Sequence, residues 1–465
     1  MSPSLKPYRD RKDSGLDWIG SIPAHWEVAR NGRLFEQRIE TGRPELPVLE
    51  ISVRTGIRVR NLDGPGRKQA MSDRSQYKAA RRGDIAYNMM RMWQGAVGVA
   101  PVDGLVSPAY VVARARAALD PRYYAYLFRT NAYMEEVNRR SRGIVKDRNR
   151  LYWLDFKQIP SLLPPFEEQV QIADFLDRHG RALSHLIRMK QRLIGLLNRQ
   201  KEAVIQAAVT RGLNPDVPLR PSGVEWVGDV PHHWRSLRTK HVSQLNPGKR
   251  ALNGLSDDAI GSFLPMEAVG EWGALDLSDH ISVGEGRSGY TYVQDGDVLI
   301  AKITPCFENG KGALCRGLHE GIGFASTEFY VLRAGSLVDP LYLYYVTRSP
   351  GYRLLGAEVM QGAAGQKRVP RDFVMNVEIP IPPFAEQTVI VQELDRKLLA
   401  LNSVIDRLAQ EIGLIEEYRT RLIADVVTGK LDIWGVEMPD IDHAREHGRD
   451  GEDVAHDHLL AYAGE

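Results

Sequence analysis

Two segments of the chain show apolar residues at helical spacing. In residues 381–432 the apolar positions alternate in steps of three and four with one gap at Arg419, which is typical of a coiled-coil seam. They are Leu394, Leu398, Leu401, Ile405, Leu408, Ile412, Ile415, Leu422 and Val426. Residues 163–213 repeat this spacing at Ile172, Leu176, Leu183, Leu186, Leu193, Leu197, Val204 and Ala208, with interruptions at His179, Lys190 and Gln200. Each segment predicts one long helix, and the simplest partner for each apolar stripe is the other helix, packed antiparallel.

Elsewhere the pattern favours short strands between turns. Strand-like stretches lie at 46–53, 96–102, 105–114, 297–303 and 324–333. Gly-Asp pairs at 83–84 and 296–297 precede two of them, as turn residues do. Helical segments are expected near 121–139 and 340–356. The fold class predicted is therefore α+β, with two β-rich domains and two long helices.

The chain is one large internal repeat. SGLDWIGSIPAHW (14–26) matches SGVEWVGDVPHHW (222–234), and LPPFEEQVQIADFLDR (163–178) matches IPPFAEQTVIVQELDR (381–396). Between these anchors RRGDIAYNMM (81–90) parallels QDGDVLIAKI (294–303), SPAYVV (107–112) parallels STEFYV (326–331), and DPRYYAYLFR (120–129) parallels DPLYLYYVTR (339–348). The segments at the domain boundaries match better than the middles of the two β-rich domains. We therefore expect the two domains to share a scaffold and to bind different ligands or sequences.

The repeat predicts six segments. They are a first β-rich domain (1–162), a central helix (163–213), a linker (214–221), a second β-rich domain (222–380), a C-terminal helix (381–432) and an acidic tail (433–465). Antiparallel helices would place the two domains at opposite ends of a rod about an approximate twofold axis. DNA also carries such axes, so this arrangement suits a target of two different half-sites with an unread spacer.

Charge is distributed unevenly. Residues 1–162 hold 29 Lys and Arg against 17 Asp and Glu, whereas residues 222–380 hold 15 against 18 and the tail 2 against 9. Such asymmetry is expected of polyanion binding, although a solvated basic face would give the same count. The 465 residues contain two cysteines, Cys306 and Cys315, too few for a disulfide framework or a four-ligand zinc site. We expect a cytoplasmic protein with no membrane span and no secretory signal.

No motif for catalysis stands out. PPF at 164–166 and 382–384 superficially matches the amino-methyltransferase motif, but Leu163 and Ile381 occupy the place where that chemistry needs Asn or Asp. Neither Gly310-Lys311 nor Gly248-Lys249 has the upstream glycine of a phosphate-binding loop. His25 and His233 recur beside Trp26 and Trp234, where a packed, hydrogen-bonded imidazole is the favoured interpretation. We therefore expect no catalytic residue, cofactor site or metal site in this chain.

Candidate DNA-reading residues are side chains able to bond base edges or phosphates. In the first domain they are Arg54, Arg58 and Arg60; Asn88, Arg91, Trp93 and Gln94; and Arg142, Lys146, Arg148, Asn149 and Arg150. In the second domain they are Lys302, Thr304, Glu308, Asn309 and Lys311, together with Gln361, Gln366, Lys367 and Arg368. Each group could instead be a solvated surface, but the repeat aligns the last two groups of the first domain with those of the second.

The paired W-[IV]-G-x-[IV]-P-x-H-W segments, the paired PPF-x-EQ helix starts and the order of segments resemble the specificity subunits of type I restriction–modification enzymes, to about residue 432. The resemblance implies two target recognition domains and helices that set the spacer and dock two modification subunits. Those subunits bind S-adenosylmethionine and methylate adenine, and restriction subunits with ATP-driven translocase and nuclease activity join them. Double-stranded DNA is the implied ligand, and the cofactors, S-adenosylmethionine and ATP with Mg²⁺, lie in the partner subunits.

Two other functions stay open. A coiled-coil structural adaptor with two protein-binding β domains fits the architecture, but the basic first domain argues against it. A self-contained methyltransferase would need the cofactor and catalytic motifs that the sequence lacks.

Overall fold

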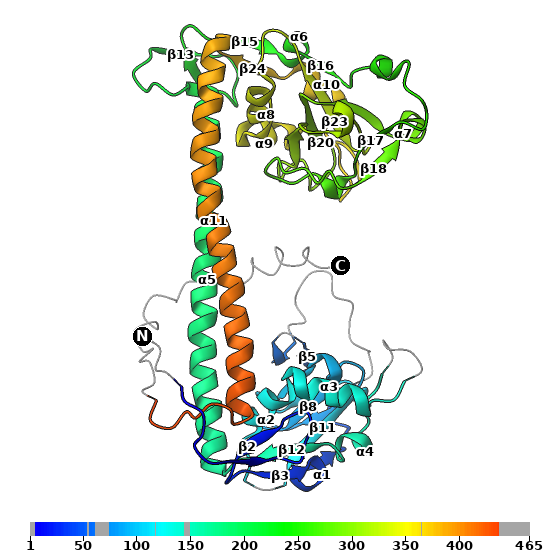
Figure 1. Ribbon diagram of the computed structural model, residues 1–465, viewed down its shortest axis with the longest axis vertical. Helices are drawn as coiled ribbons and strands as arrows, with labels where there is room; N and C mark the ends of the chain where they lie inside the picture. The colour runs from blue at the N-terminus through cyan, green and yellow to red at the C-terminus, as the bar shows by residue number, and fades with distance from the viewer. Residues whose placement is uncertain are drawn as a thin grey trace. The chain divides into compact units, whose positions relative to one another are not determined.

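The computed structural model describes residues 5–53, 55–60, 74–116, 118–143, 149–363 and 365–436. They form two compact units: the first takes in the described residues up to 189 and from 410 onward, and the second takes in residues 190–409 (Figure 1). The boundary between the units divides both long helices, α5 (Phe166–Arg211) and α11 (Phe384–Val427), so that each unit contains part of each helix. Each unit therefore combines one β-rich domain with parts of both helices.

The first unit is built on an antiparallel sheet in the order β4-β11-β8-β9. Successive side chains of a strand point to opposite faces, so Ile85 and Tyr87 enter the larger core whereas Ala86 enters a smaller one. Helices α2 and α3 cover the face of the larger core. The bounds are β4 Phe35–Arg38, β8 Ile85–Asn88, β9 Val97–Val99, β11 Tyr110–Ala115, α2 Pro121–Phe128 and α3 Asn131–Arg140.

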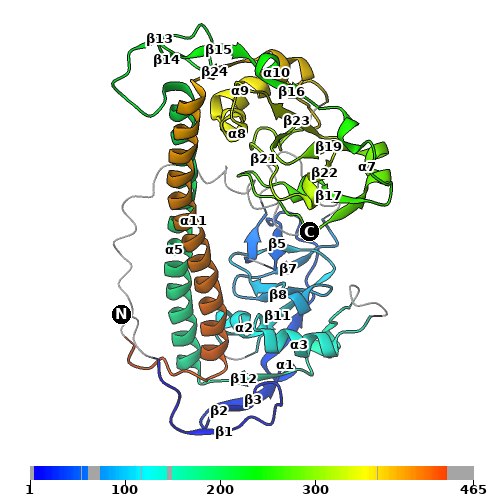
Figure 2. The same ribbon diagram turned by 45° about the horizontal axis from the view of Figure 1, so that its top comes forward.

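The second unit repeats this sheet as β16-β23-β20-β21, and α8 lies on the corresponding face (Figure 2). Val298 and Ile300 enter one core while Leu299 and Ala301 enter another, the same alternation as in β8. The bounds are β16 Ser243–Leu245, β20 Asp297–Ala301, β21 Gly312–Leu314, β23 Phe329–Ala334, α8 Pro340–Arg348 and α9 Pro350–Glu358. The predicted strands and helices of both domains are confirmed, with the stretch 105–114 divided into β10 and β11 and the stretch 324–333 divided into β22 and β23.

Smaller paired strands recur beside each sheet. The first unit has β1 (Arg11–Asp13) with β2 (Ser21–Pro23), and β3 (Glu27–Arg30) with β12 (Pro160–Leu163). The second has β13 (Leu219–Pro221) with β14 (Asp229–Pro231), and β15 (Arg235–Arg238) with β24 (Glu378–Ile381). The short helices α1 (Asn31–Leu34), α4 (Trp153–Phe156), α6 (Thr239–Val242) and α10 (Arg371–Asn376) complete the repeat.

The two domains differ in their middles. The first inserts the pairs β5 (Leu49–Ser52) with β6 (Gly56–Val59) and β7 (Lys78–Ala80) with β10 (Gly104–Val106). The second inserts a four-stranded sheet, β18-β17-β22-β19, with the helix α7 (Val283–Gly289). Its strands are β17 Ile260–Leu264, β18 His280–Ser282, β19 Thr291–Gln294 and β22 Ile322–Ala325. The repeated scaffold thus carries unlike insertions, as the sequence predicted.

The two long helices run antiparallel. In the first unit Ile172 and Leu176, near the start of α5, share a core with Leu422 and Val426, near the end of α11. In the second unit the end of α5 shares a core with Ile390 and Leu394 of early α11. The predicted antiparallel pairing is therefore confirmed. None of the helices in the described ranges is both long and apolar enough to cross a membrane.

Each Gly-Asp turn combines a glycine with positive φ and a buried aspartate that forms an ion pair. Gly83 and Gly296 adopt positive φ values of 90° and 91°, which favour glycine because it lacks a Cβ. The following aspartates are buried, and each forms an ion pair with an arginine of the same sheet: Asp84 with Arg38 at 2.6 Å and Asp297 with Arg333 at 2.7 Å. These carboxylates hold the sheet together, so their recurrence does not require a catalytic role.

Candidate nucleic-acid interface

The recurring joint motifs contact one another. In the first unit His25 Nε2 lies 2.8 Å from Oε2 of Glu168, and the side-chain oxygen of Gln169 accepts the backbone N–H of Asp120 at 3.0 Å. Glu168 and Gln169 are the last two residues of PPFEEQ, His25 belongs to the AHW segment, and Asp120 caps α2. Three motifs that lie far apart in the sequence thus meet at the start of one helix.

The second unit builds the same joint. His233 Nε2 lies 2.8 Å from Oε2 of Glu386, and Gln387 accepts the backbone N–H of Asp339, the cap of α8, at 2.8 Å. The indole N–H of the buried Trp234 also donates to Glu386 at 3.1 Å. As predicted, both imidazoles are hydrogen-bonded beside a buried tryptophan. This structural role accounts for the recurrence of the two histidines.

The first candidate DNA-reading surface forms around residues 88–95, here called the first reading loop. The backbone N–H of Leu151 donates to the carbonyl of Met89 at 2.9 Å, which brings this loop beside the described ends of 141–150. Arg91, Gln94 and Arg150 are exposed. The loop ends at Gly95, whose φ of 85° turns the chain into β9. Two predicted DNA-reading segments are therefore neighbours in space.

The hairpin of β5 and β6 adds further basic residues. Arg58 lies opposite Glu50 in the hairpin and forms a 2.5 Å ion pair with it. Burial raises the pKa of Tyr110, and the charges that act on the same hydroxyl include Glu50, Arg91 and Arg60. Both arginines, which come from different segments, lower the pKa of this hydroxyl, so the hairpin and the first reading loop share one electrostatic environment.

Several other candidates in this domain are held by the protein itself. The side chain of Asn88 is buried and accepts the backbone N–H of Met90 at 2.9 Å, and the indole N–H of Trp93 donates to the carbonyl of Met90 at 3.0 Å. Arg142 pairs with Asp155 at 2.5 Å, and Asn149 donates to Asn138 at 2.9 Å. Asn88 and Trp93 thus shape the reading loop. Arg54, Lys146 and Arg148 lie outside the described residues.

The second reading surface repeats the first. Residues 301–312, here called the second reading loop, lie beside 360–371 because Val369 N–H donates to the carbonyl of Lys302 at 2.9 Å. In the aligned repeats Val369 corresponds to Leu151 and Lys302 to Met89, so the same hydrogen bond holds both surfaces. Gln361, Gln366, Lys367 and Arg368 are all exposed on this second surface.

Most charged candidates of the second surface have protein partners. Arg368 pairs with Glu328 at 2.8 Å, the amine of Lys311 donates to the carbonyl of Met266 at 3.0 Å, and that of Lys302 donates to Thr327 at 2.5 Å. Thr304 donates to Glu308 at 3.0 Å, and Asn309 donates to Glu271 at 2.9 Å. Three exposed residues have side chains with no partner among the described residues, and they are the strongest candidates here for contacts with a ligand: Gln361, Gln366 and Lys367.

The sequence analysis did not identify two arginines that contact these loops. Arg129 and Arg348 are the last residues of the aligned segments DPRYYAYLFR and DPLYLYYVTR. Their recurrence was the available signal, but arginines at helix ends are common and the pattern alone does not show what they touch.

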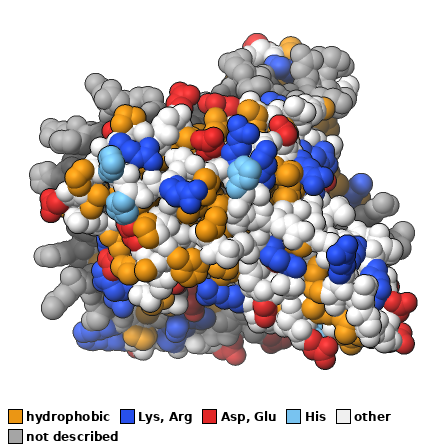
Figure 3. Space-filling model, turned by 90° about the horizontal axis from the view of Figure 1, so that it is seen from above, with side chains coloured by type: hydrophobic (Ala, Val, Ile, Leu, Met, Phe, Trp, Pro, Cys, Tyr) orange, Lys and Arg blue, Asp and Glu red, His pale blue; other side chains and the backbone are white. Residues whose placement is uncertain are grey.

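The described residues contain no group of three or more His, Cys, Asp and Glu side chains arranged to hold a metal ion. Cys306 and Cys315 are free thiols, and Cys315 lies in a core. On the face seen in Figure 3, basic side chains lie scattered among hydrophobic and uncharged ones rather than in one block.

No known family model matches the chain. It is 39% identical over 176 residues to the specificity subunit of the type I restriction enzyme EcoEI of Escherichia coli, and 36% identical over 187 residues to that of EcoAI from the same species. These alignments cover 37% and 39% of this chain but only 29% and 30% of those relatives' lengths. At 22% identity, the putative type I restriction enzyme MjaX specificity subunit of Methanocaldococcus jannaschii aligns over 89% of this chain and 96% of its own length.

A solved structure concerned with complex assembly and conformational transition of the type I R-M system matches with a TM-score of 0.58 at 17% identity. The match covers 88% of this chain and 99% of that one, and at this identity it shows the fold alone. The relatives confirm the resemblance that the joint motifs predicted, and the solved structure confirms the fold.

Proposed function

We propose that this chain, as a relative of the type I specificity subunits, recognises double-stranded DNA at two different half-sites separated by a spacer that it does not read. The first unit reads one half-site and the second unit reads the other. The helix pair sets the distance between them.

One observation carries this proposal: the same backbone hydrogen bond presents different side chains in the two domains. Leu151 with Met89 and Val369 with Lys302 hold equivalent loops at equivalent places. The first surface displays Arg91 and Gln94, whereas the second displays Gln366 and Lys367. Base-edge recognition depends on which donors and acceptors a fixed scaffold presents. A repeated scaffold with unlike reading residues therefore suits an asymmetric bipartite target.

The uneven charge supports a division of labour. Residues 1–162 carry twelve more basic than acidic residues, 29 against 17, whereas residues 222–380 carry three fewer, 15 against 18. Phosphate contacts supply most of the sequence-independent affinity for DNA. The first domain thus provides most of the attraction, and tethering raises the effective concentration of DNA at the second.

We assign the chemistry to partner subunits. Two modification subunits, which bind S-adenosylmethionine and methylate adenine, dock on this chain, and restriction subunits use ATP with Mg²⁺. The chain itself serves as a non-catalytic reader in the cytoplasm. The candidate catalytic motif supports this division, since Leu163 and Ile381 have no polar side chain to hold a target amino group.

The test is selection from a random duplex library by the purified full-length chain, followed by binding at several salt concentrations. The proposal predicts two short enriched motifs at fixed separation, and a logarithm of affinity that falls linearly with the logarithm of salt concentration. An adaptor with protein-binding domains would enrich no DNA sequence at all. Methyl transfer by the chain alone would instead identify a self-contained methyltransferase.

A further inference from the structure

A buried arginine recurs beneath the two reading loops. Arg129 ends the segment that forms α2, and Arg348 is the last residue of α8, at the same position of the repeat. Each lies against the left-handed glycine that ends or turns its reading loop, Gly95 with φ of 85° and Gly310 with φ of 74°. The same residue type therefore supports equivalent loops whose own sequences differ.

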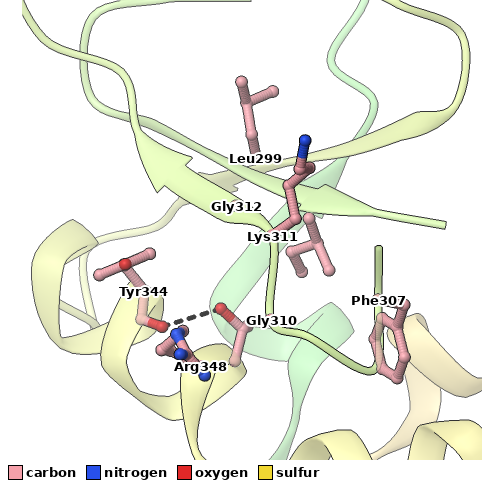
Figure 4. A pocket seen from close by; sticks show the side chains of 9 residues that line it. Leu299, Phe307, Gly310, Lys311, Gly312, Tyr344 and Arg348 are labelled. Carbon is pink, nitrogen blue, oxygen red and sulfur yellow. Dashed lines mark hydrogen bonds between the residues drawn. The ribbon is translucent and has the colours of Figure 1, made fainter. Parts of the chain in front are cut away.

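The contact is closest in the second unit. A Cβ atom on Gly310 would lie 2.4 Å from Nη1 and 2.8 Å from Cζ of Arg348, so the loop backbone rests on the guanidinium. Figure 4 shows the Arg348 guanidinium beside Gly310, while the side chain of Lys311 points away from it. Arg353, from α9, touches the same glycine position at 3.0 Å and donates to the carbonyl of Glu308. Two arginine side chains thus contact the backbone of the second reading loop on its buried side.

Arg348 is also connected to the long helices. Its Cζ lies 3.9 Å from the ring centroid of Trp272, and the Nζ of Lys201, from α5, lies 3.4 Å from the same centroid. Lys201 in turn donates to Asn402 of α11 at 2.6 Å. Cation–π contacts strengthen when they are desolvated, and Lys201 and Arg348 are only 2% and 3% exposed. A continuous set of contacts therefore runs from both helices to the second reading loop.

The first unit has the corresponding connections. Arg129 donates to the carbonyl of Val53 at the turn of the β5–β6 hairpin, and its Nη1 lies 3.3 Å from the Cβ position of Gly56. Its Cγ lies 3.8 Å from the Cβ position of Gly95, in the first reading loop. Arg129 therefore joins two DNA-reading segments of the first domain.

The first unit has a helix cation that corresponds to Lys201. Burial lowers the pKa of Arg129, and the charge of Arg419, on α11, lowers it further. Arg419 follows Pro382 by 37 positions, as Lys201 follows Pro164, so these two helix cations occupy the same place in the repeat. The repeat thus places a cation at the same helix position in both units, and in the second unit its contacts lead to the arginine beneath the loop.

A contribution to stability does not by itself account for the buried charge of Arg348 in the second unit. Among the described residues, Nε and Nη1 of Arg348 have no hydrogen-bond acceptor, and its acidic neighbour Glu202 lies 3.8 Å away. Burying a cation with incomplete pairing costs free energy, and replacing such groups with apolar ones often stabilises a protein. A positional role gives a reason for keeping the charge there.

We propose that Arg129 and Arg348 are the positioning residues of the two reading loops, and that Arg348 also transmits the position of Lys201, on α5, to the loop that it supports. This inference rests on the proposed function of the loops. It assigns half-site selectivity to residues beneath the reading surface, in addition to those on it.

The test compares full-length variants by selection from the same random duplex library. Arg348→Met should reduce discrimination at the second half-site by at least about tenfold, the value of one good bidentate base contact, and leave the first half-site unchanged. Arg129→Met should do the reverse. Trp272→Phe, which keeps an aromatic face, should retain selection, whereas Trp272→Leu should lose it at the second half-site only. Arg407→Met, at an exposed arginine of α11, is the control for lost charge.

The outcomes separate the two proposals. If the unaltered chain enriches no bipartite motif, the proposed function fails and this inference fails with it. If the unaltered chain selects two half-sites and Arg348→Met selects the same two with equal discrimination, the proposed function stands and the inference is wrong. Equal loss at both half-sites, with an unchanged circular dichroism spectrum, would also overturn it, since the positioning role is local to one loop.

Discussion

The side-chain oxygen of Gln387 accepts the backbone N–H of Asp339 at 2.8 Å, and its amide nitrogen donates to the carbonyls of Leu337 and Pro382, both at 2.9 Å. Gln169 binds Asp120 and Pro164 in the same way. One fully buried glutamine in each unit thus joins the start of a long helix to the cap of the helix on the sheet. The hydrogen bonds of this glutamine account for the recurrence of both PPF-x-EQ and the Asp-Pro segments.

Replacing that glutamine should destabilise one unit. Gln387→Leu leaves a backbone N–H and two carbonyls without a partner in a buried place, and we expect a loss of about 2 kcal/mol in the free energy of unfolding. Urea denaturation followed by circular dichroism measures this loss. Gln392→Leu is the matched control, because Gln392 is exposed on the same helix. Equal destabilisation by the two variants would show that Gln387 is not the joint that its contacts indicate.

Exchange of one reading domain should change one half-site. Replacing residues 14–162 by the corresponding domain of another specificity subunit keeps the second unit's own contacts, since Val369 and Lys302 belong to that unit. The selected motif should therefore change in its first half alone. A change in both halves would contradict the modular account.

The spacer should follow the length of the helices. Seven residues inserted within 183–197 preserve the heptad and lengthen α5 by roughly 10 Å. This corresponds to about 3 base pairs at the rise of DNA. A second variant lengthens α11 by seven residues as well, which keeps the antiparallel pair in register. Both half-sites should persist at a longer separation, and an unchanged separation would mean that the helices are not the ruler.

Stability should depend on Lys201 at alkaline pH. Burial, with a smaller contribution from Arg348, lowers the pKa of Lys201 from its ordinary 10.5 to about 8. The unfolded chain therefore binds more protons than the folded one between these two values, so the free-energy penalty of burying this cation is relieved as pH rises from 8 to 10.5, and stability rises with it. Unfolding at several pH values should show this rise, and Lys201→Met should abolish it. If Lys201→Met follows the same pH profile as the unaltered chain, the depressed pKa is refuted.

The sequence predicted the scaffold well because its signals are local or repeated. Gly83 and Gly296 stand where the turns need positive φ. The ends of the predicted helix stripes are buried, as at Ile172 and Val426, whereas Leu186 and Leu193 in the middle of α5 are exposed. The joint residues His25 and Glu168, which are 143 positions apart, could be identified as important by recurrence, but nothing in the sequence shows that they touch. Contacts between distant segments depend on tertiary packing.

Which candidate DNA-reading residues are available to a ligand was harder to predict for the same reason. Asn88 and Trp93 have the right chemistry for base contacts, yet both bond to the backbone of their own loop. Arg58 and Arg368 are basic and exposed, yet each pairs with a glutamate from another strand or loop. Residue type shows what a side chain can do, whereas its partners decide what remains available to a ligand.

Methylome sequencing of a host that expresses this chain with its modification subunits tests the central claim most directly. The account predicts one new methylated motif made of two unlike half-sites at a fixed separation, with methylated adenine in both. Omitting the chain while keeping the modification subunits should abolish the motif. A single continuous motif, or methylation that does not depend on the chain, would contradict the account.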